Sequence, residues 1–220
     1  MTSAVGSGNL QVRQLVVVRG GKPVVNGIQL SVRPASVTAL MGANGAGKTS
    51  TVLAIAGVVP AASGSVVLDG LDIQGLPADA IRRLGLATVR EGHQVLRELT
   101  VLDNLRAAGG DLRERQLVQA VDEQLALFPE LATRLRSRAG DLSGGQQQMV
   151  SLAQAMIVRP RFLLIDELSF GLAPAVVARL VPVIQRIAAT GVGILLIEQF
   201  TTLALALSDH VVVMSRGSVS

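Results

Sequence analysis

The chain has 220 residues, 20 of them basic and 16 acidic, which gives a formal net charge of +4. Its length suits one large domain, or one domain that carries a subdomain. Hydrophobic residues make up 49% of the chain, which excludes intrinsic disorder, and the absence of Cys excludes disulfides, thiolate metal sites and a Cys nucleophile. With no Trp or Tyr, four Phe and this small net charge, the chain lacks the stacking platforms and basic surface that a nucleic-acid partner requires.

The first third of the chain has the composition of β-strands. Strands are expected where residues are β-branched or alternate between apolar and polar, at 10–18, 28–32, 36–40 and 65–68. The dipeptide Asp69-Gly70 predicts a turn after the last of these strands. The strand at 36–40 leads directly into a glycine-rich loop, and a helix is expected to follow this loop at 47–56.

The middle of the chain, residues 91–158, changes to helical spacing. Apolar residues recur three or four positions apart at Val101, Leu105 and Ala108, and again along 117–128. Pro129 is expected to end the second of these helices, because proline cannot continue one. A further amphipathic stretch follows at 149–158. The middle therefore has the pattern of a helical insertion.

The last part of the chain returns to strands that are apolar throughout. The runs at 162–165, 194–197 and 211–214 do not alternate, which is typical of parallel strands covered on both faces. A helix is expected at 174–189, between the first two strands, and strand, helix, strand is the βαβ pattern. The fold class expected is therefore α/β with a mainly parallel sheet.

Two further features concern membranes. No uncharged apolar run reaches the roughly 18 residues that a bilayer span needs. Residues 1–8 lack the basic region followed by an apolar run that marks a secretion signal.

The glycine-rich loop has the spacing of a phosphate-binding P-loop, G-x-x-x-x-G-K-[ST]. Its residues are Gly42-Ala43-Asn44-Gly45-Ala46-Gly47-Lys48-Thr49. Glycines let successive amides turn inward, and the following helix N-terminus adds partial positive charge. Lys48 is expected to reach the β- and γ-phosphates, and the Thr49 hydroxyl to bind Mg²⁺. The alternative is a plain turn between strand and helix.

Two carboxylates follow the apolar strand at 162–165. A buried strand delivers Asp166 to the edge of the sheet where ligands bind in open α/β folds. Asp166 is expected to hold Mg²⁺, and Glu167 to act as the general base that polarises the attacking water. The alternative is a pair of solvated acids at a strand end.

A third motif is Leu142-Ser143-Gly144-Gly145-Gln146, directly before the amphipathic stretch at 149–158. Two glycines beside a Ser at a helix start can expose amides and a hydroxyl to an anion, and the alternative is an ordinary N-cap. With a P-loop before it and an Asp-Glu strand end after it, the chain resembles the ATP-binding subunit of ABC transporters over residues 10–220.

This resemblance implies a fold, two cofactors and a set of site residues. It implies a single ABC ATPase domain over 1–220: a P-loop core (1–90 and 159–220) with an N-terminal antiparallel β part, and a helical subdomain (91–158). It implies that ATP and Mg²⁺ bind, with Ser50 added to the P-loop residues, Arg19 in the place of an aromatic residue that stacks on adenine, and Ser143 to Gln146 acting on ATP held by a second subunit. Two more residues stand at positions that the family uses in catalysis: Glu91, also a metal ligand, in the Q-loop, and Gln199 in the place of a His.

Shorter motifs narrow the resemblance to one branch of the family. They are Arg90-Glu91-Gly92-His93, 127–131, 171–174 and 197–199, and they are similar to the second ATPase subunit of importers for branched-chain amino acids, urea and short amides. The expected function is therefore ATP hydrolysis that drives such an importer. Implied partners are a second ATPase subunit, membrane permeases and, indirectly, a substrate-binding protein, and the implied location is cytoplasmic, on the inner face of the plasma membrane.

Four departures from the family pattern support an alternative function. Arg19 stands in place of an aromatic residue, and Arg90 and Leu168 each stand in place of a proline. Gln199 stands in place of a histidine and cannot carry a proton at neutral pH. The alternative is a nucleotide-binding regulatory subunit with weak or no hydrolysis, paired with a more active ATPase. An ABC protein acting on DNA or ribosomes is disfavoured, because those usually contain two ATPase units or long insertions.

Three smaller expectations complete the sequence analysis. The permease is expected to dock at a groove between core and helical subdomain, near Glu91 to Arg106, with Arg97 and Glu98 on its surface. His93 and His210 are expected to be surface or loop-packing residues. The family usually continues with a strand and a helix beyond the position of Ser220, which leaves a sheet edge to be expected there.

Overall fold

The computed structural model describes residues 8–92 and 94–219. Over these residues the strands are β1 (Leu10–Arg19), β2 (Lys22–Val32), β3 (Val37–Met41), β4 (Ser63–Leu68), β5 (Leu71–Asp72), β6 (Leu86–Val89), β7 (Phe162–Asp166), β8 (Gly193–Glu198), β9 (His210–Ser215) and β10 (Ser218–Val219). The helices are α1 (Lys48–Ile55), α2 (Ala78–Arg83), α3 (Val101–Ala108), α4 (Glu114–Leu127), α5 (Pro129–Ala132), α6 (Gly144–Met156), α7 (Pro174–Ala189) and α8 (Thr201–Leu207), with a 3₁₀ turn at Ala139–Asp141.

Two sheets organise the molecule. The central sheet has the order β10-β9-β3-β8-β7-β6, and its strands from β9 to β6 are all parallel, while β10 pairs antiparallel with β9 at the edge. The second sheet, β2-β1-β4-β5, is antiparallel throughout. The expected α/β class, the mainly parallel sheet and the N-terminal antiparallel part are confirmed.

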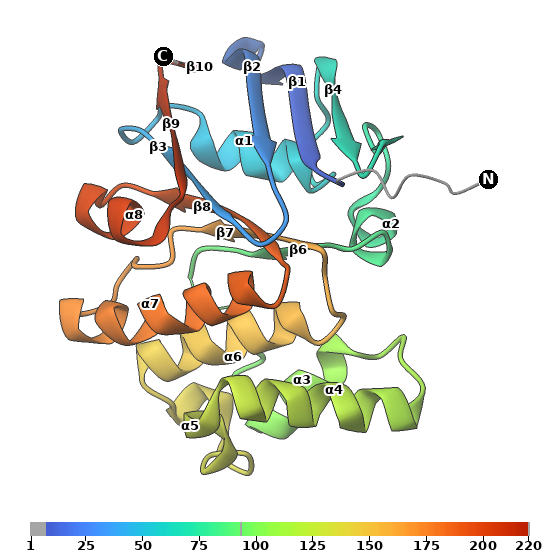
Figure 1. Cartoon of the computed structure of the whole chain (residues 1–220), viewed down its shortest axis with the longest axis vertical. Helices are drawn as coiled ribbons and strands as arrows, with labels where there is room; N and C mark the ends of the chain where they lie inside the picture. Colours follow the sequence, from blue (N-terminus) through green and yellow to red (C-terminus); the bar gives the residue numbers. More distant parts are fainter. Residues whose placement is uncertain (1–7, 93, 220) are drawn as a thin grey trace.

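The apolar strands of the central sheet are buried on both faces, as their sequence predicts. Along β7, Leu163 and Ile165 belong to one core cluster together with residues of α6 and α7. Their neighbours Phe162 and Leu164 belong to the other cluster, together with residues of α1 and the antiparallel sheet. Helix α1 therefore lies between the two sheets, and α6 and α7 cover the opposite face of the central sheet (Figure 1).

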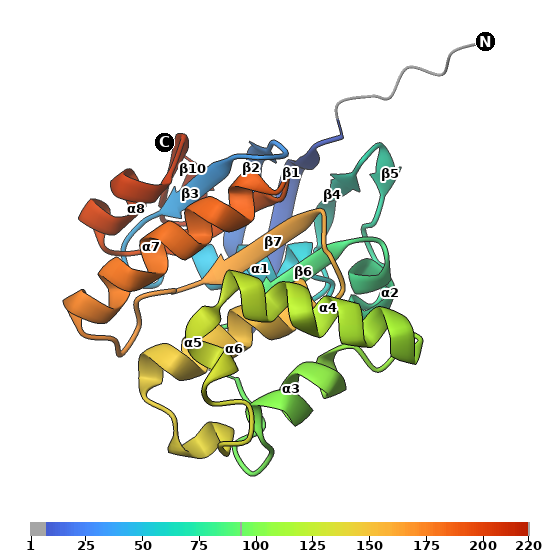
Figure 2. The same cartoon turned by 60° about the horizontal axis from the view of Figure 1, so that its bottom comes forward.

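The segment between β6 and β7 is helical, as expected, and α3, α4 and α5 lie beyond α6 at one end of the molecule (Figure 2). Pro129 does more than end a helix, because α4 ends at Leu127 and Pro129 is the first residue of α5. Proline suits a first helical position, where its missing N–H has no intrahelical partner. The sequence analysis did not predict β5, β6, β10, α5 or α8.

No helix of the described residues is both long enough and apolar enough to cross a membrane. The expectation that the first eight residues carry no secretion signal falls almost wholly outside the described residues, as does the one about His93.

Candidate functional site

The residues predicted for the phosphate loop, the metal and the catalytic base come together at one edge of the central sheet. The glycine-rich loop follows β3, Glu91 follows β6, Asp166 is the last residue of β7, and Gln199 follows β8. Because these strands are parallel, their carboxyl ends all point to the same edge, where ligands bind in open α/β sheets. Residues that are far apart in the sequence thus form one site.

The phosphate loop ends in a glycine that no other residue can replace without strain. Gly47 is the N-cap of α1 with a φ of 102°. A Cβ on Gly47 would lie 2.4 Å from the carbonyl oxygen of Val24 in β2. This close approach lets β2 pack directly against the loop.

Lys48 is the first residue of α1, and only 4% of it is exposed. Its Nζ donates to the carbonyl oxygens of Gly42 at 2.8 Å and Ala43 at 3.1 Å, so its ammonium lies over the loop. The first amides of α1 have no intrahelical acceptor, and its first turn contains no acidic residue. This end of the helix therefore favours an anion.

The other residues of the phosphate loop differ in their hydrogen bonds and their exposure. The amide of Ala46 donates to the carbonyl oxygen of Ala43 at 3.1 Å, so this amide closes a turn within the loop. Asn44 and Gly45 are exposed, and Ser50 is half-buried one residue after Thr49.

The loop is also held by the distant end of the described chain. The amide of Gly217 donates to the carbonyl oxygen of Ala46 at 3.0 Å, and the amide of Asn26 donates to the carbonyl oxygen of Gly217 at 2.7 Å. The turn between β9 and β10 therefore ties the phosphate loop to β2.

Asp166 has the environment of a cation ligand. It is 3% exposed, and its Oδ1 is buried without a hydrogen-bond partner. Burial, the largest cause, and the charges of Glu167 and Glu91 raise the pKa of Asp166 to about 6, against lowering by the Thr49 hydroxyl and Lys48. Asp166 and Thr49 together present oxygen ligands, the type that Mg²⁺ prefers.

Glu167 and Gln199 are in direct contact. Gln199 Nε2 donates to Glu167 Oε1 at 2.5 Å, and the Glu167 amide donates to the carbonyl oxygen of Ile197 at 3.0 Å. Glu167 has a φ of 51°, which is uncommon for a residue with a side chain. The loop is well supported there, since Leu168, in the place of a proline, is fully buried.

Sequence reasoning missed Glu198, which holds this loop from the other side. Glu198 is 1% exposed and accepts hydrogen bonds from the backbone amide and the hydroxyl of Ser169, both at 2.9 Å. The signal that could have found Glu198 is an acid at the end of an apolar strand. The sequence analysis uses this residue only as part of the family motif at 197–199.

Arg19 and Glu91, at the margins of the predicted site, are exposed. Arg19 lies at the tip of the β1–β2 hairpin, before the Gly20-Gly21 turn, and β2 runs from this tip past the phosphate loop. Glu91 is exposed after β6, and its charge acts on Asp166. His210, expected at the surface, is exposed at the start of β9.

The motif at Ser143 begins α6 and is used within the chain. Ser143 caps α6: its hydroxyl accepts from the Gln146 amide at 3.4 Å, and Gln146 Oε1 accepts from the Ser143 amide at 3.2 Å. Gly145 is buried, because a Cβ there would lie 2.2 Å from Val176 Cγ1 of α7. Helices α6 and α1 cover opposite faces of the central sheet, so the fold separates this motif from the phosphate loop (Figure 1).

A parallel sheet with a phosphate loop, an antiparallel sheet and a helical insertion define an ABC-type ATPase. The family model for the ABC transporter matches residues 25–169, so the chain belongs to the ABC transporter family. It is an ATP-binding subunit of a transporter, and its enzymatic class is that of an ATPase coupled to transport.

Three known proteins illustrate the range of this similarity. The chain is 38% identical over 193 residues to the high-affinity branched-chain amino acid transport ATP-binding protein BraG of Pseudomonas aeruginosa, covering 87% of this chain and 82% of the relative. It is 31% identical over 212 residues to the lipopolysaccharide export system ATP-binding protein LptB of Escherichia coli, covering 94% and 87%. A solved ATP-binding cassette of an ABC transporter in its ADP conformation matches with a TM-score of 0.89 and 26% identity, over 97% of this chain and 89% of that chain.

Proposed function

We propose that this chain is the Mg²⁺-dependent ATPase subunit of an importer for branched-chain amino acids or related small polar solutes. The observation that carries the catalytic part is the convergence of Lys48, Thr49, Asp166 and Glu167 at one sheet edge. The importer is favoured because identity to BraG, 38%, exceeds identity to the export protein LptB, 31%. The subunit would then lie on the inner face of the plasma membrane, held there by its permease.

The proposed roles follow from the contacts. Lys48 binds the β- and γ-phosphates, exchanging its bonds to Gly42 and Ala43 for bonds to ATP. Thr49 and Asp166, with Glu91 nearby, would hold Mg²⁺, which supplies charge neutralisation of the phosphates. Glu167 accepts a proton from the attacking water, and Gln199 orients the Glu167 carboxylate through the 2.5 Å hydrogen bond.

We further propose that ATP is enclosed between two copies of the ATPase subunit. The phosphate loop and the residues Ser143 to Gln146 belong to opposite faces of the sheet within one chain. A second subunit, turned head to tail, could bring its Ser143 and following amides to the exposed side of the ATP. Each of the two sites then combines the phosphate loop of one subunit with the Ser143 motif of the other.

The test is the variant Glu167→Gln, studied by light scattering with and without Mg-ATP. It is expected to bind ATP, to lose hydrolysis and to change from monomer to dimer when ATP is added. Normal hydrolysis by this variant would show that Glu167 is not the base. A monomer at saturating ATP would contradict a homodimer and require a different ATPase partner.

One observation favours a regulatory subunit as the second candidate function. Gln199 Nε2 donates a hydrogen bond to one carboxylate oxygen of Glu167, the proposed base. Glutamine cannot transfer a proton at neutral pH as histidine can. Such a subunit would bind ATP and turn it over slowly beside a more active partner. Hydrolysis rates measured with and without that partner ATPase distinguish the two functions.

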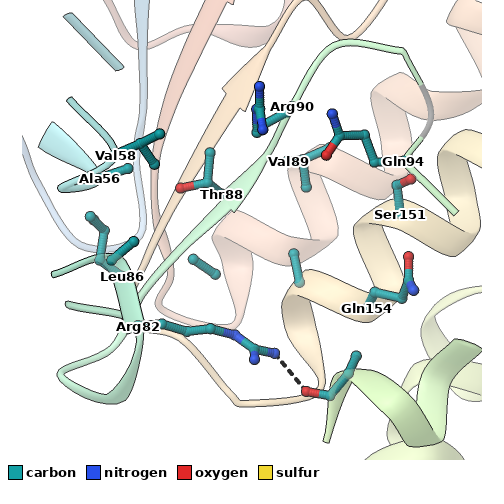
Figure 3. A pocket seen from close by; sticks show the side chains of 14 residues that line it. Ala56, Val58, Arg82, Leu86, Thr88, Val89, Arg90, Gln94, Ser151 and Gln154 are labelled. Carbon is teal, nitrogen blue, oxygen red and sulfur yellow. Dashed lines mark hydrogen bonds between the residues drawn. The ribbon is translucent and has the colours of Figure 1, made fainter. Parts of the chain in front are cut away.

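We place permease docking at a groove between the core and the helical subdomain, of about 330 Å³ (Figure 3). Its walls come from α2 and β6 on the core side and from α3 and α6 on the other, and include Arg90 and Gln94. Arg82 closes one end, since its Nη2 donates to the carbonyl oxygen of Ala108 at 2.6 Å. Arg97 and Glu98 do not line this groove: their segment packs on the loop at 138–140 instead.

A further inference from the structure

Glu198 is a buried acid whose oxygens are all engaged with one loop. Its Oε1 accepts from the Ser169 amide and its Oε2 from the Ser169 hydroxyl, each at 2.9 Å, while the Gln199 amide donates to Oε2 at 3.3 Å. A buried carboxylate is costly unless hydrogen bonds compensate it. Burial raises the pKa of Glu198, and the hydrogen bonds from Ser169 and Gln199 oppose this rise.

These bonds connect the two segments that carry the proposed catalytic groups. Ser169 lies two residues after Glu167, and Gln199 directly follows Glu198. The loop after β7 is thus joined to the end of β8 at Glu167 and again at Ser169. Because Gln199 Nε2 bonds to Glu167 Oε1, the contacts form a closed ring.

We propose that Glu198 is a positioning residue for ATP hydrolysis, which holds Glu167 and Gln199 in contact by accepting hydrogen bonds from Ser169 on one side and from the Gln199 amide on the other. The inference rests on the proposed function in taking Glu167 as the base. Glu167 needs such support, since its φ of 51° is one that side-chain-bearing residues seldom adopt.

The donors around Glu198 explain why a carboxylate suits this position. The Ser169 amide, the Ser169 hydroxyl and the Gln199 amide all point at it, and a carboxylate only accepts hydrogen bonds. The amide group of a glutamine could serve Ser169, but it would turn an NH₂ towards the amide of Gln199. The segment bearing Gln199 would then lose its anchor.

The test is Glu198→Gln, assayed as the full chain for ATP hydrolysis and for thermal unfolding. We expect kcat to fall about tenfold or more, as displaced catalytic groups do, while KM stays within about twofold. We expect Tm to change by no more than a few degrees, because removal of a costly buried charge offsets the lost hydrogen bond from the Gln199 amide. Glu98→Gln is the matched control, since the Glu98 side chain is 89% exposed.

A second variant tests the route through Ser169. Ser169→Ala removes one of the two hydrogen bonds with Ser169 and leaves the anchor of Gln199 in place, so kcat should fall less than in Glu198→Gln. The ring of contacts is already open in Glu198→Gln, so the double variant should be no slower than Glu198→Gln alone. Effects that multiply in the double variant would overturn the inference, as would an unchanged kcat in Glu198→Gln. A fall in Tm large enough for unfolding to account for the lost activity at the assay temperature would overturn it too. If the unaltered protein shows no Mg-ATPase activity, both the proposed function and this inference are wrong. An active protein with an active Glu198→Gln variant overturns the inference alone.

Discussion

Lys48 is the residue on which ATP binding is expected to depend most. Its ammonium already lies over the phosphate loop, held by the carbonyl oxygens of Gly42 and Ala43. Lys48→Ala should weaken ATP binding more than tenfold, or about 1.4 kcal/mol. Titration with a fluorescent ATP analogue measures this change, and Arg115→Ala on the exposed face of α4 is the charge-matched control. A loss below about threefold would contradict the role of Lys48.

Asp166 should make the stability of the metal-free protein depend on pH. Its pKa is raised to about 6 from 3.8, so the folded state binds this proton more tightly than the unfolded chain. The resulting stabilisation is complete below about pH 4 and is lost as pH rises through about 6. Asp166→Asn should therefore be more stable than the unaltered protein at pH 8, by up to about 3 kcal/mol.

Chemical unfolding in EDTA at pH 8 and pH 5 checks this expectation. The advantage of Asp166→Asn should shrink at pH 5, where the aspartic acid is largely protonated. An advantage that is the same at both pH values would show that burial does not perturb this carboxyl in the folded protein.

Single residues also show which parts of the site the sequence can predict. Lys48, Asp166 and Glu167 are predictable because their chemistry depends on spacing within one short segment. The contact of Glu198 with Ser169 is not, because it joins segments 29 residues apart and depends on how β8 lies beside β7. An acid at a strand end has no local signal that separates a buried ligand from a solvated one.

At the scale of elements, the close approach of α6 and α7 depends on Gly145. A Cβ there would lie 2.2 Å from Val176 Cγ1, and a valine in a helix has little freedom to turn away. Gly145→Ala should destabilise the protein by about 1–3 kcal/mol, measured by urea unfolding. Gly110→Ala is the control, with its nearest contact at 3.6 Å.

Val176→Ala should rescue the Gly145→Ala variant, because it removes the clashing methyl group. The double variant is expected to be more stable than Gly145→Ala alone. Failure of this rescue would show that Gly145 is needed for its backbone and not for the packing of α7.

Elements differ in how far the sequence predicts them. The strands of 5–11 residues carry enough apolar positions to show an alternation or a continuous apolar run, and the long helices α4 and α7 carry enough to show a helical period. The four-residue β6 and α5 and the six-residue α2 contain at most one or two turns or pleats, too few for a pattern. Their placement comes from tertiary contacts, such as the pairing of β6 with β7.

For the whole molecule, the groove in Figure 3 makes a prediction about coupling. Ala78 is exposed on the groove wall, and the residues proposed for catalysis do not line this groove. Ala78→Trp should fill the groove, abolish solute uptake and leave the basal ATPase activity of the isolated subunit unchanged. Ala132→Trp, exposed on the helical part outside this groove, is the control.

Uptake of labelled leucine by cells carrying each variant in place of the unaltered subunit measures this effect. Uptake that stays normal with Ala78→Trp would place the permease elsewhere. A loss of basal ATPase activity would instead mean that the groove belongs to the catalytic machinery.

The overall architecture follows from the sequence further than the pairing of subunits does. Apolar strands separated by helices dictate a parallel sheet, and parallel strands dictate one shared edge for the site. The separation of Ser143 from the phosphate loop becomes visible only when α1 and α6 are placed on opposite faces of that sheet. Local patterns contain no information about this separation.

The bond between Gly217 and Ala46 has a consequence for how the protein is made. Strand β3 finds its neighbours β8 and β9 only among residues 193–215, and the loop after β3 gains its last support at residue 217. On the ribosome, the residues that hold the phosphates therefore emerge early and remain without this frame until nearly all the described chain has been translated. We therefore expect the growing polypeptide to acquire tight nucleotide binding late in synthesis, after the turn between β9 and β10 has emerged.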